Sequence, residues 1–196
     1  MSAIRIIVLI VILTTPPVSS QVRHILGCRT DLLLESERVI SQEMGKTELN
    51  NDASHVALYN TVAGVDRRSP YCASGQYYGF YKACQILGIP YKYIPIPRTA
   101  LAYNVFLHGK KYGLKTEYEA HRHDLIVWKT PGKITGHIER VRNVIGGGWV
   151  DTYAFNTTRN VGNPREGDCN AIKRRNIYNP LHRMQVLGLV GFREVE

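Results

Sequence analysis

Three consecutive glycines, Gly146 to Gly148, separate two segments in which apolar and polar residues alternate. Residues 137–145 precede the glycines and residues 149–156 follow them. Alternation is typical of a half-buried strand, and a strand, a glycine turn and a second strand predict a β-hairpin. The hairpin commits this half of the chain to a sheet.

The chain before the hairpin has a different pattern, with apolar residues spaced by three and four positions, which is typical of helices. This pattern predicts helices over residues 31–44, 54–62 and 72–87, with a further helix beginning near Thr99. After about Glu119 the pattern is that of strands, at residues 125–128, 171–176 and 184–193 besides the hairpin. Helices followed by a run of strands favour an α+β fold. We expect N-terminal helices packed on a small antiparallel β-sheet.

Residues 1–20 differ from the rest of the chain. Arg5 precedes an uninterrupted apolar run from Ile6 to Leu13, and small residues follow two prolines. About eight apolar residues cannot span ~30 Å of hydrocarbon, so the segment resembles a signal peptide more than a membrane helix. An uncleaved anchor is the alternative. We therefore expect an exported protein, periplasmic or extracellular, with one domain over residues 21–196 and no stable membrane association once the signal is removed.

The sequence has 196 residues and a formal net charge of +9, which predicts affinity for a polyanion without identifying it. No glycine-rich phosphate-binding motif is present, so nucleotide binding has no support. His121 and His123 form an H-x-H pair, but no Cys or carboxylate ligands accompany them at a recognisable spacing. We expect neither a metal nor a cofactor.

Cys72 begins the predicted helix over residues 72–87, directly after Pro70 and Tyr71. The helix dipole and the free backbone N–H groups there stabilise a thiolate and lower a cysteine pKa. The small residues that follow Cys72 leave room for a substrate. Cys72 is therefore a candidate nucleophile, and the alternative is a core cysteine that happens to begin a helix.

The hairpin register connects His137 to a candidate partner. A two-residue loop at Gly146 and Gly147 places His137 opposite Asn156, where the amide could orient the imidazole. The same register places Asp151 about 17 Å further along the strand, opposite Arg142.

Other polar and sulfur-containing side chains have weaker assignments. Glu139 lies opposite Ala154 in the same register; it could assist His137, but a solvated surface carboxylate is the favoured interpretation. Cys84 is expected in the core, while Cys28 and Cys169 could pair or remain free.

Four motifs follow one another in the chain: Pro70-Tyr71-Cys72-Ala73, Asp124-Leu125-Ile126-Val127-Trp128, Gly136-His137-Ile138-Glu139-Arg140-Val141 and Phe155-Asn156-Thr157. Their order and spacing resemble the CHAP branch of papain-like peptidoglycan amidases and endopeptidases, to which the NlpC-type enzymes are related. The resemblance extends over most of residues 35–193. The C-terminal part is similar to exported bacterial members of the family, particularly those of Bacteroides-like organisms.

The resemblance implies a papain-like, NlpC-like cysteine peptidase fold in which Cys72 is the nucleophile, His137 the base and Asn156 the orienting residue. Glu139 and Tyr71 are possible accessory residues. The sequence departs from the family where Ala154 replaces a Glu and where Ser74-Gly75 replaces Ala-Phe.

The implied function is hydrolysis of an amide bond in peptidoglycan through an acyl-enzyme. Peptidoglycan or its fragments would be the partner, rather than nucleic acid, and an inhibitor or immunity protein is a possible further partner. Two alternatives remain: a papain-like protease or transferase acting on proteins, and a catalytically inactive cell-wall-binding module, which the Ala154 departure mildly supports.

Overall fold

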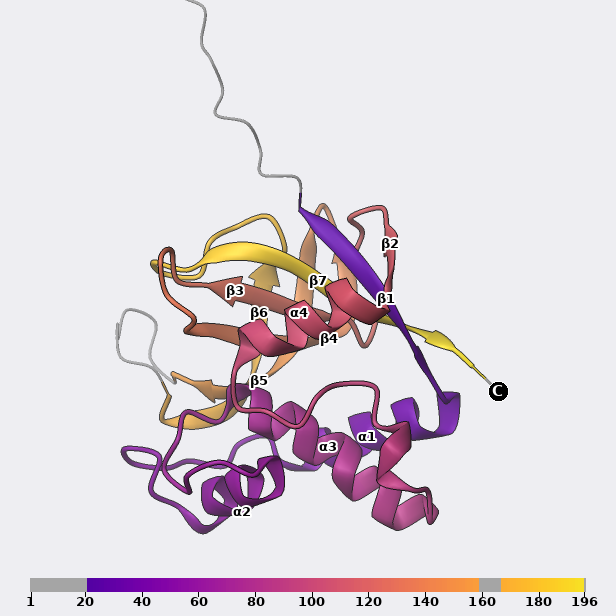
Figure 1. Ribbon diagram of the computed structural model, residues 1–196. Helices are drawn as coiled ribbons and strands as arrows, with labels where there is room; N and C mark the ends of the chain where they lie inside the picture. The colour runs from indigo at the N-terminus through magenta and orange to yellow at the C-terminus, as the bar shows by residue number, and fades with distance from the viewer. Residues whose placement is uncertain (1–20, 159–166, 196) are drawn as a thin grey trace, which may run out of the picture.

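The computed structural model describes residues 21–158 and 167–195 of the chain (Figure 1). The expected signal peptide, residues 1–20, lies outside the described residues. No helix in the described part of the chain is long and apolar enough to cross a membrane.

The described residues form four α-helices, one short 3₁₀-helix and seven strands. The helices are α1 (Thr30–Gln42), α2 (Ser54–Ala63), α3 (Cys72–Leu87), η1 (Tyr91–Tyr93) and α4 (Ala102–Tyr112). The strands are β1 (Val22–Cys28), β2 (Leu114–Thr116), β3 (Leu125–Lys129), β4 (Gly136–Gly146), β5 (Trp149–Thr157), β6 (Cys169–Asn176) and β7 (Gln185–Glu194).

All seven strands belong to one sheet with the order β2-β1-β7-β3-β4-β5-β6. The strands β1 and β7 are parallel, and every other neighbouring pair is antiparallel. The predicted α+β class is confirmed. The expected small antiparallel sheet is wrong, because a strand from the N-terminal part of the chain, β1, inserts between β2 and β7 and makes the sheet mixed.

The helices lie on the sheet in two groups (Figure 1). Helices α1, α2 and α3 gather at one end of the sheet, where α3 packs against α1, α2, β4 and β5. Helix α4 crosses the front and packs against β1, β3, β4 and β7. The largest buried apolar cluster lies between these helices and the sheet, and includes Phe80, Val105, Val127 and Ile138.

Helix α3 has the predicted bounds. It ends at Gly88, whose left-handed φ of 66° is the usual conformation after a helix terminus. Gly75 lets the first turn of α3 approach β5, because a Cβ there would lie 2.4 Å from the ring of Phe155. That close approach requires a residue without a side chain at this position.

Strand β1 was not predicted, because it buries two polar side chains, Arg23 and His24, that obscure the alternation. Arg23 forms a two-point ion pair with Asp124, with Nε–Oδ2 and Nη2–Oδ1 distances of 2.8 and 2.9 Å. The partner lies 101 positions away, so no local pattern shows that Arg23 is paired. Cys28 ends β1 as a buried thiol, and Cys84 and Cys169 are also buried. No disulfide joins Cys28 to Cys169.

The β4–β5 hairpin has the predicted register only near its open end. Glu139 lies opposite Ala154 as expected. Near the turn the prediction is wrong, because Gly146 pairs with Trp149 and Asp151 faces Asn143 rather than Arg142. Two irregularities in the ladder between the turn and Val141 restore the expected pairing further along.

Candidate functional site

Cys72 is the first residue of α3 and is buried, with 3% of its surface exposed. The N–H of Gly75 donates to the carbonyl of Tyr71 over 2.8 Å and closes the first turn. The N–H groups before Gly75 have no acceptor within the helix, as at every helix start. The thiol therefore lies beside free backbone donors at the positive end of the helix dipole.

His137 lies at the start of β4, opposite Trp128 of β3. The two rings are 6.1 Å apart between centroids, and the indole N–H donates to the carbonyl of Asn179 over 3.2 Å. Gly136 allows β3 and β4 to come this close, because a Cβ there would lie 2.1 Å from the carbonyl oxygen of Trp128. The imidazole is thus held against an indole that is itself fixed.

The hydrogen-bond partner of His137 is Glu139, two residues later on the same strand. The distance from His137 Nε2 to Glu139 Oε1 is 3.1 Å. Glu139 is 0% exposed, so its interpretation as a solvated surface carboxylate is wrong. With Nε2 engaged by Glu139, Nδ1 is the ring nitrogen that remains for a further partner.

Two further side chains hold the Glu139 carboxylate. Thr152 of β5 donates its hydroxyl to Oε2 over 2.6 Å. Arg175 of β6 donates to both oxygens, from Nη2 to Oε1 over 2.7 Å and from Nε to Oε2 over 3.0 Å. Three adjacent strands therefore converge on one buried carboxylate. The sequence contained only a weak signal for Arg175, a basic run of three residues that resembles a solvated face.

The pKa values of His137 and Glu139 shift in opposite directions. Burial alone lowers the pKa of His137, but interaction with Cys72 and then with Glu139 outweighs burial and raises it to about 10. Burial raises the pKa of Glu139, whereas its hydrogen bond to His137 and the charge of Arg175 lower it to about 2. At neutral pH the site therefore holds a protonated imidazole next to an ionised carboxylate.

Asn156 is buried near the end of β5 but does not lie in the ladder with His137, where the β4–β5 pairing extends only to Glu139 and Ala154. Its backbone φ of 54° is left-handed and interrupts the strand. Its Oδ1 lies against Gly167, where an added Cβ would be 1.6 Å away. Among the described residues, no hydrogen bond joins Asn156 to His137.

Tyr71 directly precedes Cys72 and is fully buried. Its ring lies 6.0 Å from that of Tyr59 between centroids, and burial raises the pKa of its hydroxyl. The sequence prediction of an accessory role for Tyr71 stays a prediction.

The H-x-H pair lies outside the Cys72 and His137 cluster. Nδ1 of His123 accepts a hydrogen bond from the Arg140 guanidinium over 3.0 Å, which leaves only Nε2 of this ring for any further partner. No group of three His, Cys, Asp or Glu side chains among residues 21–158 and 167–195 could hold a metal ion.

Comparison of the chain with protein-family models, with curated proteins and with solved structures finds no match in any of the three. The resemblance to peptidoglycan hydrolases therefore stays a prediction. What can be argued about function depends on the geometry around His137.

Proposed function

We propose that the protein is a cysteine hydrolase in which Cys72 attacks an amide carbonyl and His137 transfers protons. Glu139 orients the imidazole and stabilises its protonated form. One observation carries the proposal: His137 Nε2 lies 3.1 Å from the buried carboxylate of Glu139. Its interactions with Cys72 and Glu139 outweigh burial and raise its pKa to about 10. An imidazole that keeps its proton at neutral pH stabilises a neighbouring thiolate, which is the nucleophilic form of cysteine.

In the acylation step the Cys72 sulfur forms a bond to the carbonyl carbon and the carbonyl π electrons move to oxygen. The free N–H groups at the start of α3 are the available donors for that oxyanion. When the tetrahedral intermediate collapses, the C–N bond breaks and His137 gives its proton to the leaving amine. The products are an amine and a thioester on Cys72.

In the deacylation step His137, now neutral, accepts a proton from water, and the hydroxide formed adds to the thioester carbon. The C–S bond then breaks, which regenerates the thiolate and releases a carboxylic acid. The net reaction is amide plus water to acid plus amine.

The third role falls to Glu139 rather than Asn156. Glu139 contacts His137 Nε2 directly and is fixed by Thr152 and Arg175. A charged orienting residue also stabilises the imidazolium more strongly than an amide would. The Ala154 departure from the family pattern thus does not argue for an inactive protein, because a carboxylate is supplied from β4.

We propose an amide of peptidoglycan as the substrate, in the stem peptide, in a cross-bridge or between stem and sugar. Two sequence observations support it: the ordered motifs of a peptidoglycan hydrolase family and the net charge of +9, which suits an anionic cell wall. A protease or transferase acting on proteins would use the same site.

The test is digestion of purified peptidoglycan by wild type and by Cys72→Ala, with mass spectrometry of the released fragments. Wild type should release fragments with a new amine and a new carboxylate, and Cys72→Ala should release none. Cys84→Ala is the matched control, because Cys84 is a second buried thiol on the same helix and should be dispensable. Equal release by wild type and Cys72→Ala would refute cysteine catalysis.

A second experiment does not depend on the substrate. Alkylation with iodoacetamide between pH 5 and 9, followed by peptide mapping, should modify Cys72 faster than Cys28 or Cys84, because burial raises the pKa of both of the latter thiols. His137→Ala should slow the reaction of Cys72 at pH 6. An unchanged rate in that variant would separate the thiol from the imidazole and contradict the proposal.

A further inference from the structure

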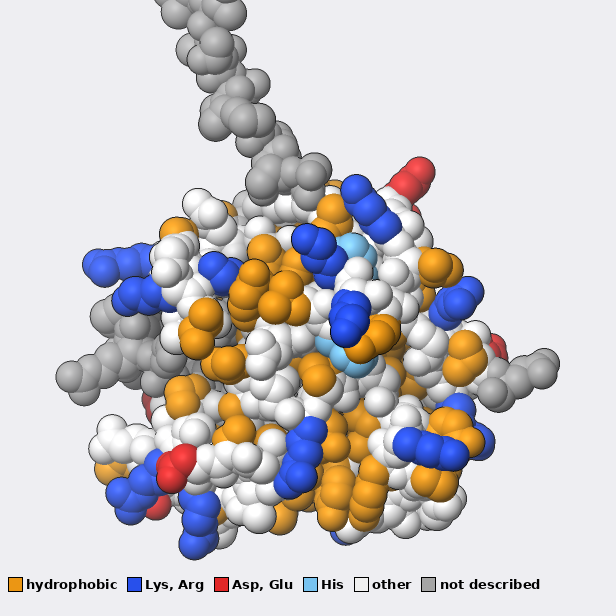
Figure 2. All heavy atoms as spheres, in the orientation of Figure 1, with side chains coloured by type: hydrophobic (Ala, Val, Ile, Leu, Met, Phe, Trp, Pro, Cys, Tyr) orange, Lys and Arg blue, Asp and Glu red, His pale blue; other side chains and the backbone are white. Residues whose placement is uncertain are grey.

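A second region of the molecule, formed by elements other than the thiol site's helix, contains a pocket of about 660 Å³. It lies where β1 and β7 begin and β3 ends, under α4. Its inner wall is formed by Phe106, Val186 and His24, each less than 9% exposed. Figure 2 shows hydrophobic side chains beside Lys, Arg and His side chains on this face.

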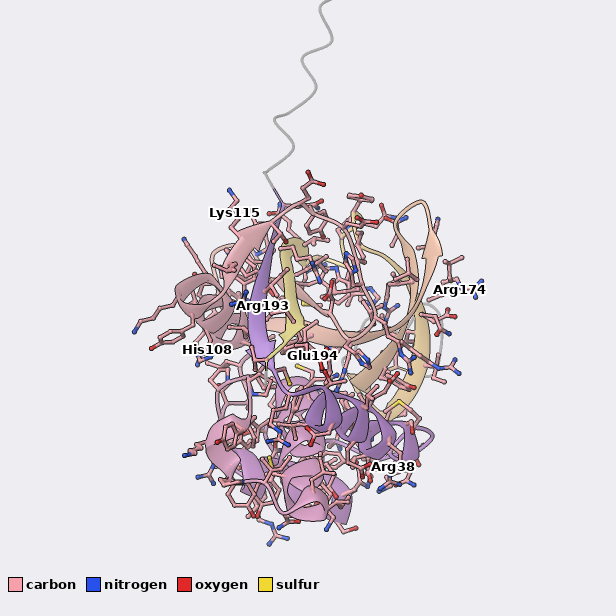
Figure 3. All side chains as sticks on the ribbon, turned by 90° about the vertical axis from the view of Figure 1, so that its right-hand side faces the viewer. Arg38, His108, Lys115, Arg174, Arg193 and Glu194 are labelled. Carbon is pink, nitrogen blue, oxygen red and sulfur yellow. The ribbon has the colours of Figure 1, made fainter. Side chains whose placement is uncertain are left out.

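Three lysines from three different elements line the same pocket: Lys110 of α4, Lys115 of β2 and Lys129 of β3. Lys115 projects outward from β2 beside the start of β1 (Figure 3). None of the three forms an ion pair with a described residue, although ten such pairs occur elsewhere in the described chain. Among the residues that the structure describes, no carboxylate lines the pocket. Three cations thus surround an apolar wall without a counter-charge.

His24 supplies an unpartnered polar atom in the wall. Its Nδ1 is buried and has no hydrogen-bond partner among the described residues. Its ring packs edge-on against Phe106 at 5.6 Å between centroids, which holds it in place. Burial first, and then the charges of Lys110 and Lys115, lower the pKa of His24, so the two lysines act on this ring. A buried polar atom without a partner is uncommon in folded proteins, and the ring that carries this atom lines the pocket.

The lining selects the chemical class of the ligand. Free inorganic phosphate would pair with the lysines but would leave Phe106 and Val186 in contact with water. A neutral apolar compound would cover the wall but leave three lysine charges unpaired. A volume of about 660 Å³ falls within the ordinary range for small-molecule sites. A molecule with one anionic head and an apolar body satisfies both parts.

We propose that this pocket binds an organic anion, with its carboxylate or phosphate head between Lys110, Lys115 and the His24 ring and its apolar body against Phe106 and Val186. The site is independent of the proposed hydrolysis, since it uses no side chain of the Cys72 centre. One lining residue lies close to the Cys72 centre: Lys129 is opposite Gly136 in the β3–β4 ladder, and Gly136 directly precedes His137.

The test is isothermal titration calorimetry of the full chain with decanoate, with decanol and with inorganic phosphate. Decanoate should bind at one site per chain, and decanol and phosphate should each bind at least tenfold more weakly. Equal binding of decanol would remove the role of the lysines, and equal binding of phosphate would remove the role of the apolar wall. Absence of decanoate binding would overturn the proposal.

Variants locate the site. Lys110→Gln/Lys115→Gln should weaken decanoate binding about tenfold, whereas the charge-matched control Lys82→Gln/Lys92→Gln, on exposed positions of α3 and η1, should not. Lys129 is left unchanged because it lies on β3, next to β4, the strand that carries His137 and Glu139.

Two further readouts separate this pocket from the hydrolytic site. Cys72→Ala should bind decanoate like wild type, and the His24 ring signals in NMR spectra should shift on binding. Loss of binding in Cys72→Ala, or an unaffected His24, would place the anion elsewhere and overturn the assignment.

Discussion

Two buried histidines in this protein have similar neighbours and opposite proton affinities. His137 and His123 each lie near a glutamate and an arginine, yet the pKa of His137 rises to about 10 and that of His123 falls to about 4. The difference depends on which group contacts the ring. At His137 the ring meets the carboxylate of Glu139 and the thiol of Cys72, while Arg175 binds the carboxylate.

At His123 the ring meets the arginine. The Arg140 guanidinium has only donors, so His123 Nδ1 must accept its hydrogen bond and remain unprotonated. Burial lowers the pKa of His123 first, and the charge of Arg140 lowers it further, against the opposing charge of Glu37. A glutamate and an arginine near each ring therefore accompany a proton carrier at His137 and a structural hydrogen-bond acceptor at His123.

The largest expected effect comes from a substitution that disrupts the His123 cluster. Arg140 is 0% exposed and donates to Ser36 Oγ and to the carbonyl of Leu33 over 2.8 and 2.9 Å. Arg140→Met should lower the free energy of unfolding by about 3–5 kcal/mol, because it leaves Ser36 Oγ, the Leu33 carbonyl and His123 Nδ1 buried without their donor. Urea denaturation measures the loss, with the exposed Arg38→Met as control. A loss below about 1 kcal/mol would show that the cluster does not organise this part of the fold.

The next effect concerns the His137 cluster. Glu139→Gln should lower kcat/KM about 100-fold or more, which corresponds to about 3 kcal/mol, and should lower the pKa of His137. Activity measurements and NMR titration of the imidazole test the two statements together, with Asp151→Asn as control on the same hairpin. Full activity in Glu139→Gln, combined with a large loss in Asn156→Ala, would return the third role to Asn156.

The two histidines should contribute to the pH dependence of stability with opposite signs. The ordinary histidine pKa is 6.5, and the folded His123 takes up its proton only near 4, so stability falls as the pH drops from about 6.5 to 4. The folded His137 keeps its proton up to about 10, so stability falls as the pH rises from about 6.5 to 10.

His123→Asn should flatten the acid limb by an amount on the order of 2 kcal/mol, and Asn accepts the positive φ of 76° at this position. His137→Gln should flatten only the alkaline limb. Chemical denaturation across this pH range measures both, and an acid limb unchanged by His123→Asn would contradict the assignment.

The smallest effect sharpens the description of the His137 cluster. Thr152→Val removes one donor from the Glu139 carboxylate and leaves Arg175 in place. We expect a loss of about 1 kcal/mol of stability and a reduction in kcat of a few fold. Restoration of both by Thr152→Ser would assign the effect to the hydroxyl rather than to packing.

Local patterns predicted the local features of this molecule. The bounds of α3, the position of Cys72 at its start and the register of Glu139 with Ala154 follow from spacing within short segments. The environment of Glu139 does not, because its burial depends on Arg175, 36 positions away on β6. A charged residue in a strand has the same local pattern whether it faces water or a buried partner.

The same limit concealed β1. The burial of Arg23 depends on its ion pair with Asp124, which directly precedes β3 and lies 101 positions away. The two polar residues Arg23 and His24 mask the alternation that marks the hairpin strands. The loss of regular strand geometry at Asn156 was equally hidden, because its left-handed backbone interrupts a pairing that the sequence extends smoothly.

The parallel pairing of β1 with β7 has a consequence for the order of events during synthesis. β1 ends at Cys28 and β7 begins at Gln185, so the ribosome completes the first of these strands on the order of 10 s before the second. β1 borders β7 on one side and only the three-residue β2 on the other. Until the last strand is made, β1 therefore lacks its main partner, and any nascent chain stalled before Gln185 presents an unpaired strand edge to chaperones and proteases.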